Sequence, residues 1–161
     1  MRCLLLSLLL IPQLSFAHGG KDHSKTEGKV LKQTDTFQDA YKSISESYKS
    51  KVEAIFQAKC FDCHSDKTKY PWYYSIPGVN LIMNSHIKEA KSHLDMTEGF
   101  PFKSHETPLN DLTELKKTIV KGSMPPWYYK PFHKDSEITS EEKEVILNWI
   151  DQSIKKLGEK K

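Results

Sequence analysis

Two cysteines and a histidine in the middle of the chain have a spacing that suits one kind of chemistry. The segment Cys60-Phe61-Asp62-Cys63-His64 reads C-x-x-C-H. Thiols separated by two residues can each form a thioether bond to a porphyrin vinyl group, and the histidine that follows can bind the iron axially. The motif therefore predicts one haem c, bound covalently through Cys60 and Cys63, with His64 as an iron ligand.

The third cysteine, Cys3, lies in a segment with the features of a signal peptide. Arg2 supplies a positive charge, residues 4 to 11 form an apolar run, and Ser15-Phe16-Ala17 has the pattern of a cleavage site. We expect residues 1 to 17 to be removed, which leaves both remaining thiols in the motif. Because the apolar run is shorter than the ~20 residues of a spanning helix, we expect a periplasmic protein with no stable membrane span after cleavage.

The basic residues disfavour nucleic acid as a partner. The formal net charge is +3, and apart from Arg2 every basic residue is a lysine. Bidentate contacts to phosphate and guanine are typically made by arginine side chains. Lysines interspersed with acidic residues are typical of a solvated surface, and some of them could steer a redox protein toward the haem. We expect the partners to be redox proteins of the periplasm.

The chain after the signal divides into a leader, a domain and a tail. Residues 18 to 35 hold few apolar side chains and several glycines and charges, which predicts a flexible leader. His18 and His23 in this leader could bind a metal ion, but we interpret them as having no such role. Residues 36 to 158 are enough for one domain with one core. Residues 159 to 161 form a C-terminal tail.

The periodicity of the domain is helical. Apolar residues recur at steps of three and four over residues 37 to 56, directly before the motif, and again over residues 79 to 94. A third helix is predicted over residues 107 to 122, with a threonine cap and a proline at its start and a glycine at its end. A fourth, over residues 139 to 158, opens with a capping box. No segment alternates with period two, so the predicted fold class is all-α.

The iron needs a second axial ligand, and Met124 is the preferred candidate. It follows the third predicted helix in Ser123-Met124-Pro125-Pro126, where two prolines restrict the backbone. A thioether is a soft, neutral ligand, and histidine/methionine ligation raises the reduction potential. Met83 and Met96 compete with it, and Met83 is interpreted as core packing. A histidine is the alternative, and the candidates are His86, His93, His105 and His133.

A four-residue pattern of aromatic residues occurs twice. Pro71-Trp72-Tyr73-Tyr74 follows the haem motif, and Pro126-Trp127-Tyr128-Tyr129 follows the methionine. Rings in these loops could wall the porphyrin, and their polar tips could donate hydrogen bonds to a propionate. We expect Trp72 and Trp127 to be buried beside the haem, whereas the tyrosines could equally belong to the core. Four residues are too few to indicate a duplicated domain.

Together these segments resemble a known family, the bacterial haem-binding domain related to single-haem cytochrome c. The likeness spans roughly residues 37 to 157, and it rests on the haem motif, Lys69 to Tyr73, Glu89 to Leu94, Gly122 to Tyr128, and Ser140-Glu141-Glu142 with Trp149. It implies a cytochrome c-like helical domain around one covalent haem, with His64 and Met124 as axial ligands. It also implies that the first and last helices cross near the haem.

Three classes of function follow from these observations. The preferred one is an electron carrier that cycles between Fe(III) and Fe(II), and such a carrier needs no catalytic residue. The alternative is a haem-based peroxidase or a gas or redox sensor with a displaceable distal ligand, although the second haem motif of di-haem peroxidases is absent. The third is a zinc or thiol site at Cys60 and Cys63. It is disfavoured because the later histidines lack zinc-ligand spacing and the motif follows a helix.

Overall fold

The computed structural model describes residues 24 to 158, and describes side chains from residue 37 onward. The predicted signal peptide with Cys3, both leader histidines and the C-terminal tail lie outside these residues. Within them every regular element is helical, apart from one isolated antiparallel bridge between Asp95 and Lys103. The all-α prediction is confirmed.

Six α-helices follow one another along the described chain, joined by loops that contain three short 3₁₀ turns. The α-helices are α1 (Ser24–Lys51), α2 (Glu53–Lys59), α3 (Phe61–His64), α4 (Val79–His93), α5 (Pro108–Lys121) and α6 (Ser140–Gly158). The 3₁₀ turns are η1 (Trp72–Ser75), η2 (Lys130–Phe132) and η3 (Lys134–Ser136). Each of the four predicted helices is therefore present, the first of them as α1 and α2.

The beginning of α1 differs from the sequence-based expectation. The helix starts at Ser24, so residues 24 to 35 are helical where a flexible leader was expected. The sequence there contains three lysines and one each of glutamate, glutamine and leucine, which are good helix formers, and it contains no proline. Extending an existing helix is easier than nucleating one, and the later half of α1 is held by its buried side chains. These residues therefore continue a helix that packing has already stabilised.

The ends of α5 and α6 are fixed by local capping contacts. At the start of α5 the Thr107 hydroxyl accepts a hydrogen bond from the Asn110 backbone N–H at 3.3 Å, and Gly122 ends the helix with a φ of 67°. At the start of α6 the Thr139 N–H donates to Glu142 Oε2 at 2.9 Å, and the Glu142 N–H donates to Thr139 Oγ1 at 3.1 Å. This reciprocal pair is a capping box. Both predicted helix starts are confirmed.

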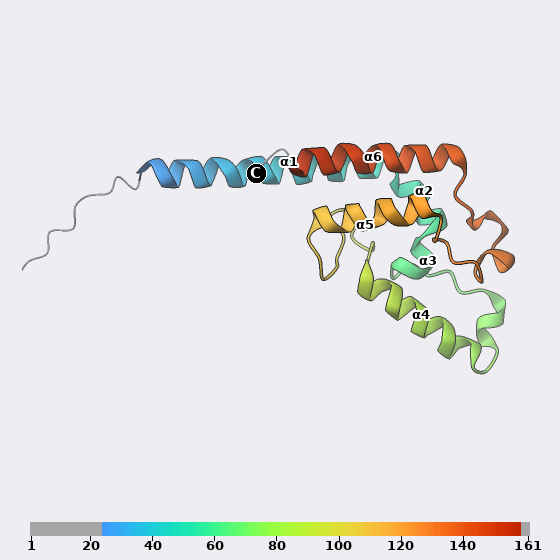
Figure 1. The fold of residues 1–161 in the computed structure, drawn as a ribbon. Helices are drawn as coiled ribbons and strands as arrows, with labels where there is room; N and C mark the ends of the chain where they lie inside the picture. The colour runs from blue at the N-terminus through green and yellow to red at the C-terminus, as the bar shows by residue number, and fades with distance from the viewer. Residues whose placement is uncertain (1–23, 159–161) are drawn as a thin grey trace, which may run out of the picture.

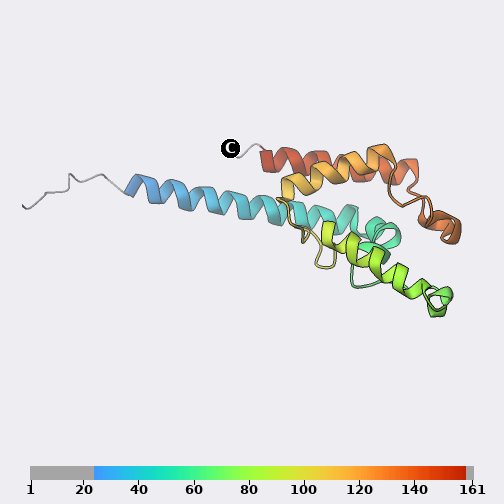
Figure 2. The same cartoon turned by 60° about the horizontal axis from the view of Figure 1, so that its bottom comes forward.

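The core lies between α1, α2, α5 and α6. Helix α6 runs alongside α1 in the opposite direction and also packs on α5 (Figure 1, Figure 2). The Tyr48 ring lies 5.6 Å from the rings of both Phe102 and Trp149, and the Phe56 ring lies 6.1 Å from that of Trp149. Such tilted and edge-on pairs add to the stability that burial provides. The first and last helices thus pack against each other, while their crossing near a haem stays a prediction.

Helix α4 stands apart from this core. It packs against α3 and η1, and none of its residues is buried (Figure 1). After α4 the chain returns to the core, where Met96, Phe100 and Phe102 are buried. No helix among residues 24 to 158 has the length and apolar character needed to cross a membrane.

Candidate functional site

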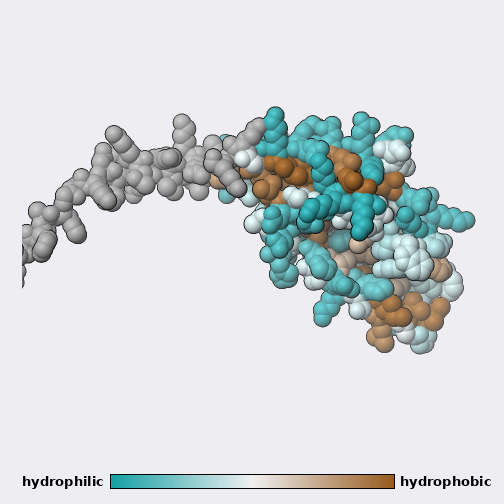
Figure 3. All heavy atoms as spheres, viewed as in Figure 1, coloured by the Kyte–Doolittle hydropathy of each residue, from teal (hydrophilic) through white to brown (hydrophobic). Residues whose placement is uncertain are grey.

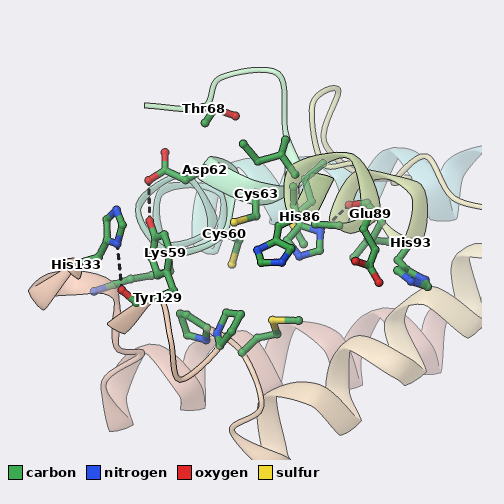
Figure 4. A pocket seen from close by; sticks show the side chains of 18 of the residues that line it. Lys59, Cys60, Asp62, Cys63, Thr68, His86, Glu89, His93, Tyr129 and His133 are labelled. Atoms are coloured by element: carbon green, nitrogen blue, oxygen red, sulfur yellow. Dashed lines mark hydrogen bonds between the residues drawn. The ribbon is translucent and has the colours of Figure 1, made fainter. Parts of the chain in front are cut away.

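A cavity of about 720 Å³ opens between two walls of the domain. Helices α3 and α4 form one wall, while α5 and the loop between α5 and α6 form the other (Figure 4). We call residues 123 to 138 of that loop the strap. The volume is typical of ligand sites, which measure roughly 300–1,000 Å³. Its apolar lining includes Ile82, Ile87, Leu94, Leu115 and Ile119.

His64 is held on the first wall by two backbone contacts. Its Nδ1 lies 2.8 Å from the Leu94 carbonyl oxygen, and its own carbonyl oxygen accepts a hydrogen bond from the Met96 N–H at 2.7 Å. A carbonyl oxygen can only accept, so Nδ1 is the protonated nitrogen of the neutral ring and Nε2 keeps its lone pair. Burial lowers the pKa of His64, which favours the neutral ring. The ring is therefore prepared to bind a metal ion through Nε2.

Both motif thiols line the same cavity as His64. Cys60 directly precedes α3 and Cys63 lies within it, and a spacing of three or four residues puts side chains on one face of a helical turn. Both cysteines are free, and their sulfur atoms point into the cavity (Figure 4). Burial raises the pKa of Cys60 to about 12 and also raises that of Cys63. The structure thus brings together all three predicted residues of the motif.

The predicted distal ligand reaches the cavity from the second wall. Met124 lies at the start of the strap, two residues after the glycine that ends α5, and lines the cavity while 41% exposed. Most of the competing ligands line the same cavity: Met83, Met96, His86, His93 and His133. His105 does not line it. The expectation that Met83 packs in the core is wrong. Helix α4 has no buried residue, and Met83 lines the cavity that the apolar side of α4 faces.

The two tryptophans are not where the sequence analysis placed them. Trp72 and Trp127 are each 81% exposed, and neither lines the cavity. The prolines before them and tyrosines after them line it instead: Pro71, Tyr73, Pro126, Tyr128 and Tyr129. The proline, which has a fixed φ, and the following turn direct successive side chains to different sides. Both copies of the pattern therefore place a tryptophan outside the cavity and tyrosine at its wall.

A polar cluster at one end of the cavity was not foreseen from the sequence. The Tyr129 hydroxyl donates to Asp62 Oδ2 at 2.9 Å (Figure 4). The Lys69 backbone N–H donates to Asp62 Oδ1 at 3.0 Å. The His133 ring stacks on the Tyr129 ring at 3.6 Å with 5° between the planes. Burial and the bond to Asp62 raise the pKa of Tyr129. The four-residue spacing of Tyr129 and His133 was the one local signal for this cluster.

These residues fit a haem. Two thiols and an imidazole with a free Nε2 share an apolar cavity of suitable volume, and soft sulfur ligands lie elsewhere on its lining. A zinc site, by contrast, requires about four close ligands. Among residues 24 to 158 no three or more histidine, cysteine, aspartate or glutamate side chains are grouped to hold a metal ion.

Comparison with known proteins agrees with this chemistry. The family model of the haem-binding domain matches residues 22 to 152. Cytochrome c peroxidase Ccp of Escherichia coli (strain K12) is 30% identical to the chain over 127 residues, which cover 77% of this chain and 26% of that protein. The chain thus spans about a quarter of the length of this relative. No solved structure matches the chain. With its C-x-x-C-H motif set in an apolar cavity, the chain belongs to the haem-binding domain family.

Proposed function

We propose that this haem-binding protein is a periplasmic single-haem c-type cytochrome that carries electrons between redox proteins. Cys60 and Cys63 would bind the haem covalently, and His64 and Met124 would be the axial ligands. One observation carries the proposal: the two thiols and the imidazole share a cavity with a methionine that reaches it from the opposite wall. A family role in haem binding is consistent with each of these assignments.

The residues around the cavity have roles that suit an electron carrier. The bound haem would supply a one-electron change between the ferric and ferrous states. The Leu94 carbonyl fixes the orientation of the His64 ring, and the end of α5 sets the start of the loop that bears Met124. The apolar part of the lining would limit the access of water to a bound haem, which would keep the surroundings of the iron nearly unchanged when its charge changes. No residue is required to act as an acid, base or nucleophile.

The location and the partners belong to the same proposal. A signal peptide over residues 1 to 17 would direct the chain to the periplasm, where covalent attachment of haem takes place in bacteria. Near the cavity, exposed aromatic residues such as Trp72, Trp127 and Phe132 offer a surface for short-lived contacts with redox proteins. Transient redox complexes use small interfaces, which bury less than about 1,200 Å² in total.

Absorption spectra of the matured protein test the proposed ligation. The protein would be exported together with haem-maturation machinery and compared with Met124→Ala and with a matched control, Met83→Ala. Met83 is the cavity-lining methionine of α4. We expect a covalent c-type spectrum in all three, and a red iron–sulfur charge-transfer band in the wild type and Met83→Ala only. Carbon monoxide should bind the reduced Met124→Ala protein and leave the other two unchanged.

Other outcomes of this experiment would contradict the proposal in separate ways. Loss of the band in Met83→Ala alone would move the sixth ligand to α4. A spectrum without the band in the wild type would favour a histidine, and His86→Ala would then be the variant to examine, because the His86 ring points into the cavity (Figure 4). A protein without covalent haem would overturn the c-type assignment itself.

A second function, reduction of peroxide, is favoured by one specific observation. The Escherichia coli relative that shares 30% identity with the chain is named a cytochrome c peroxidase. Peroxide reduction needs an iron position that the substrate can reach, and Met124 is 41% exposed at the cavity. Carbon monoxide binding to the reduced wild-type protein, together with peroxide-dependent oxidation of a reduced donor, would support this function. If the protein neither binds carbon monoxide nor oxidises the donor with peroxide, peroxide reduction is excluded and electron transfer stays the proposed function.

A further inference from the structure

The strap is tied to the haem motif by one side-chain hydrogen bond. We infer that Asp62 and Tyr129 form a clasp that holds the strap over the cavity and so positions Met124. Both are positioning residues in this inference. Its second part, the effect on Met124, rests on the proposed function, whereas its first part concerns the strap alone.

Asp62 is a well-fixed acceptor for the clasp. It lies in α3 between the two motif cysteines. Its Oδ1 already accepts the Lys69 backbone N–H at 3.0 Å, which restricts the rotation of the carboxylate. Its Oδ2 is then directed to the Tyr129 hydroxyl at 2.9 Å. A hydrogen bond to a charged carboxylate is about twice as strong as a neutral one. The clasp therefore joins the strap to the rigid turn that also bears His64.

Tyr129 is equally well fixed on the strap side. The His133 ring stacks on the phenol ring at 3.6 Å, and its Nδ1 donates to the Tyr129 carbonyl oxygen at 3.1 Å. The Tyr129 N–H donates to the Pro126 carbonyl oxygen at 3.0 Å. This turn leads back through two prolines to Met124, and prolines leave the backbone little freedom. A fixed Tyr129 therefore limits where Met124 can lie.

Near Met124 the strap also has apolar contacts, since Pro125 is buried, but among the described residues the bond to Asp62 is its one side-chain hydrogen bond to the haem motif. At its far end the Lys59 ammonium contacts the Asp135 carbonyl oxygen and lies 3.8 Å from Glu142. Between these anchors and α5, Trp127 is exposed, the Tyr128 ring lies 5.3 Å from the His86 ring, and the Phe132 ring lies 5.6 Å from the Tyr73 ring. Loss of the clasp would leave the middle of the strap held by its own turns and by these ring contacts, without a hydrogen bond to the haem motif. Asp62 would thus set the position of the strap relative to the helical turn that bears His64.

Digestion of the haem-loaded protein by a lysine-specific protease tests the first part of the inference. Lys130 and Lys134 lie in the strap, next to the clasp. Tyr129→Phe removes only the donating hydroxyl, and Tyr74→Phe is the matched control because its hydroxyl donates to Asn84 Oδ1 at 3.1 Å away from the strap. We expect cleavage at the strap lysines to be about tenfold faster in Tyr129→Phe than in wild type. Equal rates in Tyr129→Phe and Tyr74→Phe would overturn the clasp.

A spectroscopic readout tests the second part and separates it from the proposed function. In Tyr129→Phe we expect the iron–sulfur band to weaken and carbon monoxide to bind, with both features unchanged in Tyr74→Phe. If Met124→Ala abolishes the band while Tyr129→Phe keeps it and is cleaved as slowly as wild type, the clasp is wrong and the ligation stands. If wild type lacks the band while Tyr129→Phe is still cleaved faster, the ligation is wrong and the anchoring of the strap is supported.

A double-mutant comparison assigns the effect to the contact between the two side chains. Once Asp62→Ala has removed the acceptor, a further Tyr129→Phe change should leave the cleavage rate within about twofold of that of Asp62→Ala alone. Independent effects of the two substitutions, which multiply in the double variant, would show that Tyr129 acts through other contacts. That result would overturn the clasp even if each single variant is cleaved faster.

Discussion

The half of the molecule built from α1, α2, α5 and α6 and the half built from α3, α4 and the strap differ in what covers their apolar side chains. In the first half the rings of Tyr48, Phe56 and Trp149 are buried against one another. In the second half α4 has no buried residue. Apolar side chains are exposed where α4 begins, at Ile76, Leu81 and Ile82 (Figure 3).

This difference indicates that the apolar side chains of the two halves are covered in different ways, by the chain itself in the first half and, we expect, by a bound group in the second. The first half removes its apolar surface from water by contacts within the chain, at about 25 cal/mol for each Å² buried. The apolar side of α4 faces a cavity instead, and the chain belongs to a haem-binding family. We therefore expect bound haem to contribute to the stability of the second half, whereas the core of the first half is covered by contacts within the chain.

The largest expected effect comes from a substitution in the first half. Phe56→Ala removes a fully buried ring beside Tyr48 and Trp149. We expect it to lower the free energy of unfolding by about 3–5 kcal/mol, whether or not haem is bound. Chemical denaturation followed by circular dichroism measures this change. Phe132→Ala is the matched control, because this phenylalanine is 71% exposed on the strap. Similar losses in the two variants would remove the distinction between the halves.

A smaller, haem-dependent effect is expected in the second half. Ile87 is half-buried on α4 and lines the cavity. In the haem-free protein, Ile87→Ala should lower the free energy of unfolding by less than about 1 kcal/mol. In the haem-loaded protein the loss should rise to about 2 kcal/mol, because the side chain then packs against the bound group. Thermal unfolding of both forms, with exposed Lys88→Ala as control, measures it. An equal loss in both forms contradicts the haem-dependent packing of α4.

The smallest effect is expected from the exposed tryptophans. Trp72→Ala and Trp127→Ala each remove a side chain that is 81% exposed and does not line the cavity. The free energy of unfolding should change by less than about 0.5 kcal/mol in the haem-loaded protein. Denaturation of each variant beside wild type measures the change. A loss as large as that of Phe56→Ala would mean that these rings are covered in the haem-loaded protein, as the sequence analysis had expected.

Features set by neighbours along the chain could be predicted from the sequence. The starts of α5 and α6 follow from hydrogen bonds between residues three apart, such as Thr139 and Glu142. The shared cavity position of Cys60, Cys63 and His64 follows from the spacing of one helical turn. Such contacts need no knowledge of the rest of the fold.

Features that depend on distant segments could not be predicted in this way. The outward direction of Trp72 and Trp127 depends on how each loop meets its wall of the cavity. The contact between Asp62 and Tyr129 joins residues 67 positions apart. The choice of sixth ligand stays a prediction for the same reason, since several methionines and histidines from different elements line one cavity. Composition and periodicity do not say which of them lies nearest to His64.

The hydrogen bond between His64 and Leu94 also affects how the cavity responds to acid. Metal binding by histidine usually competes with protons for the same nitrogen. Here Nδ1 keeps its proton and donates it in a hydrogen bond to the Leu94 carbonyl oxygen. Burial lowers the pKa of the ring. A metal ion that binds Nε2 near neutral pH therefore displaces no proton from this residue. Binding of a metal ion to His64 should therefore release no protons. The imidazole then contributes little to any pH dependence of metal binding near neutral pH.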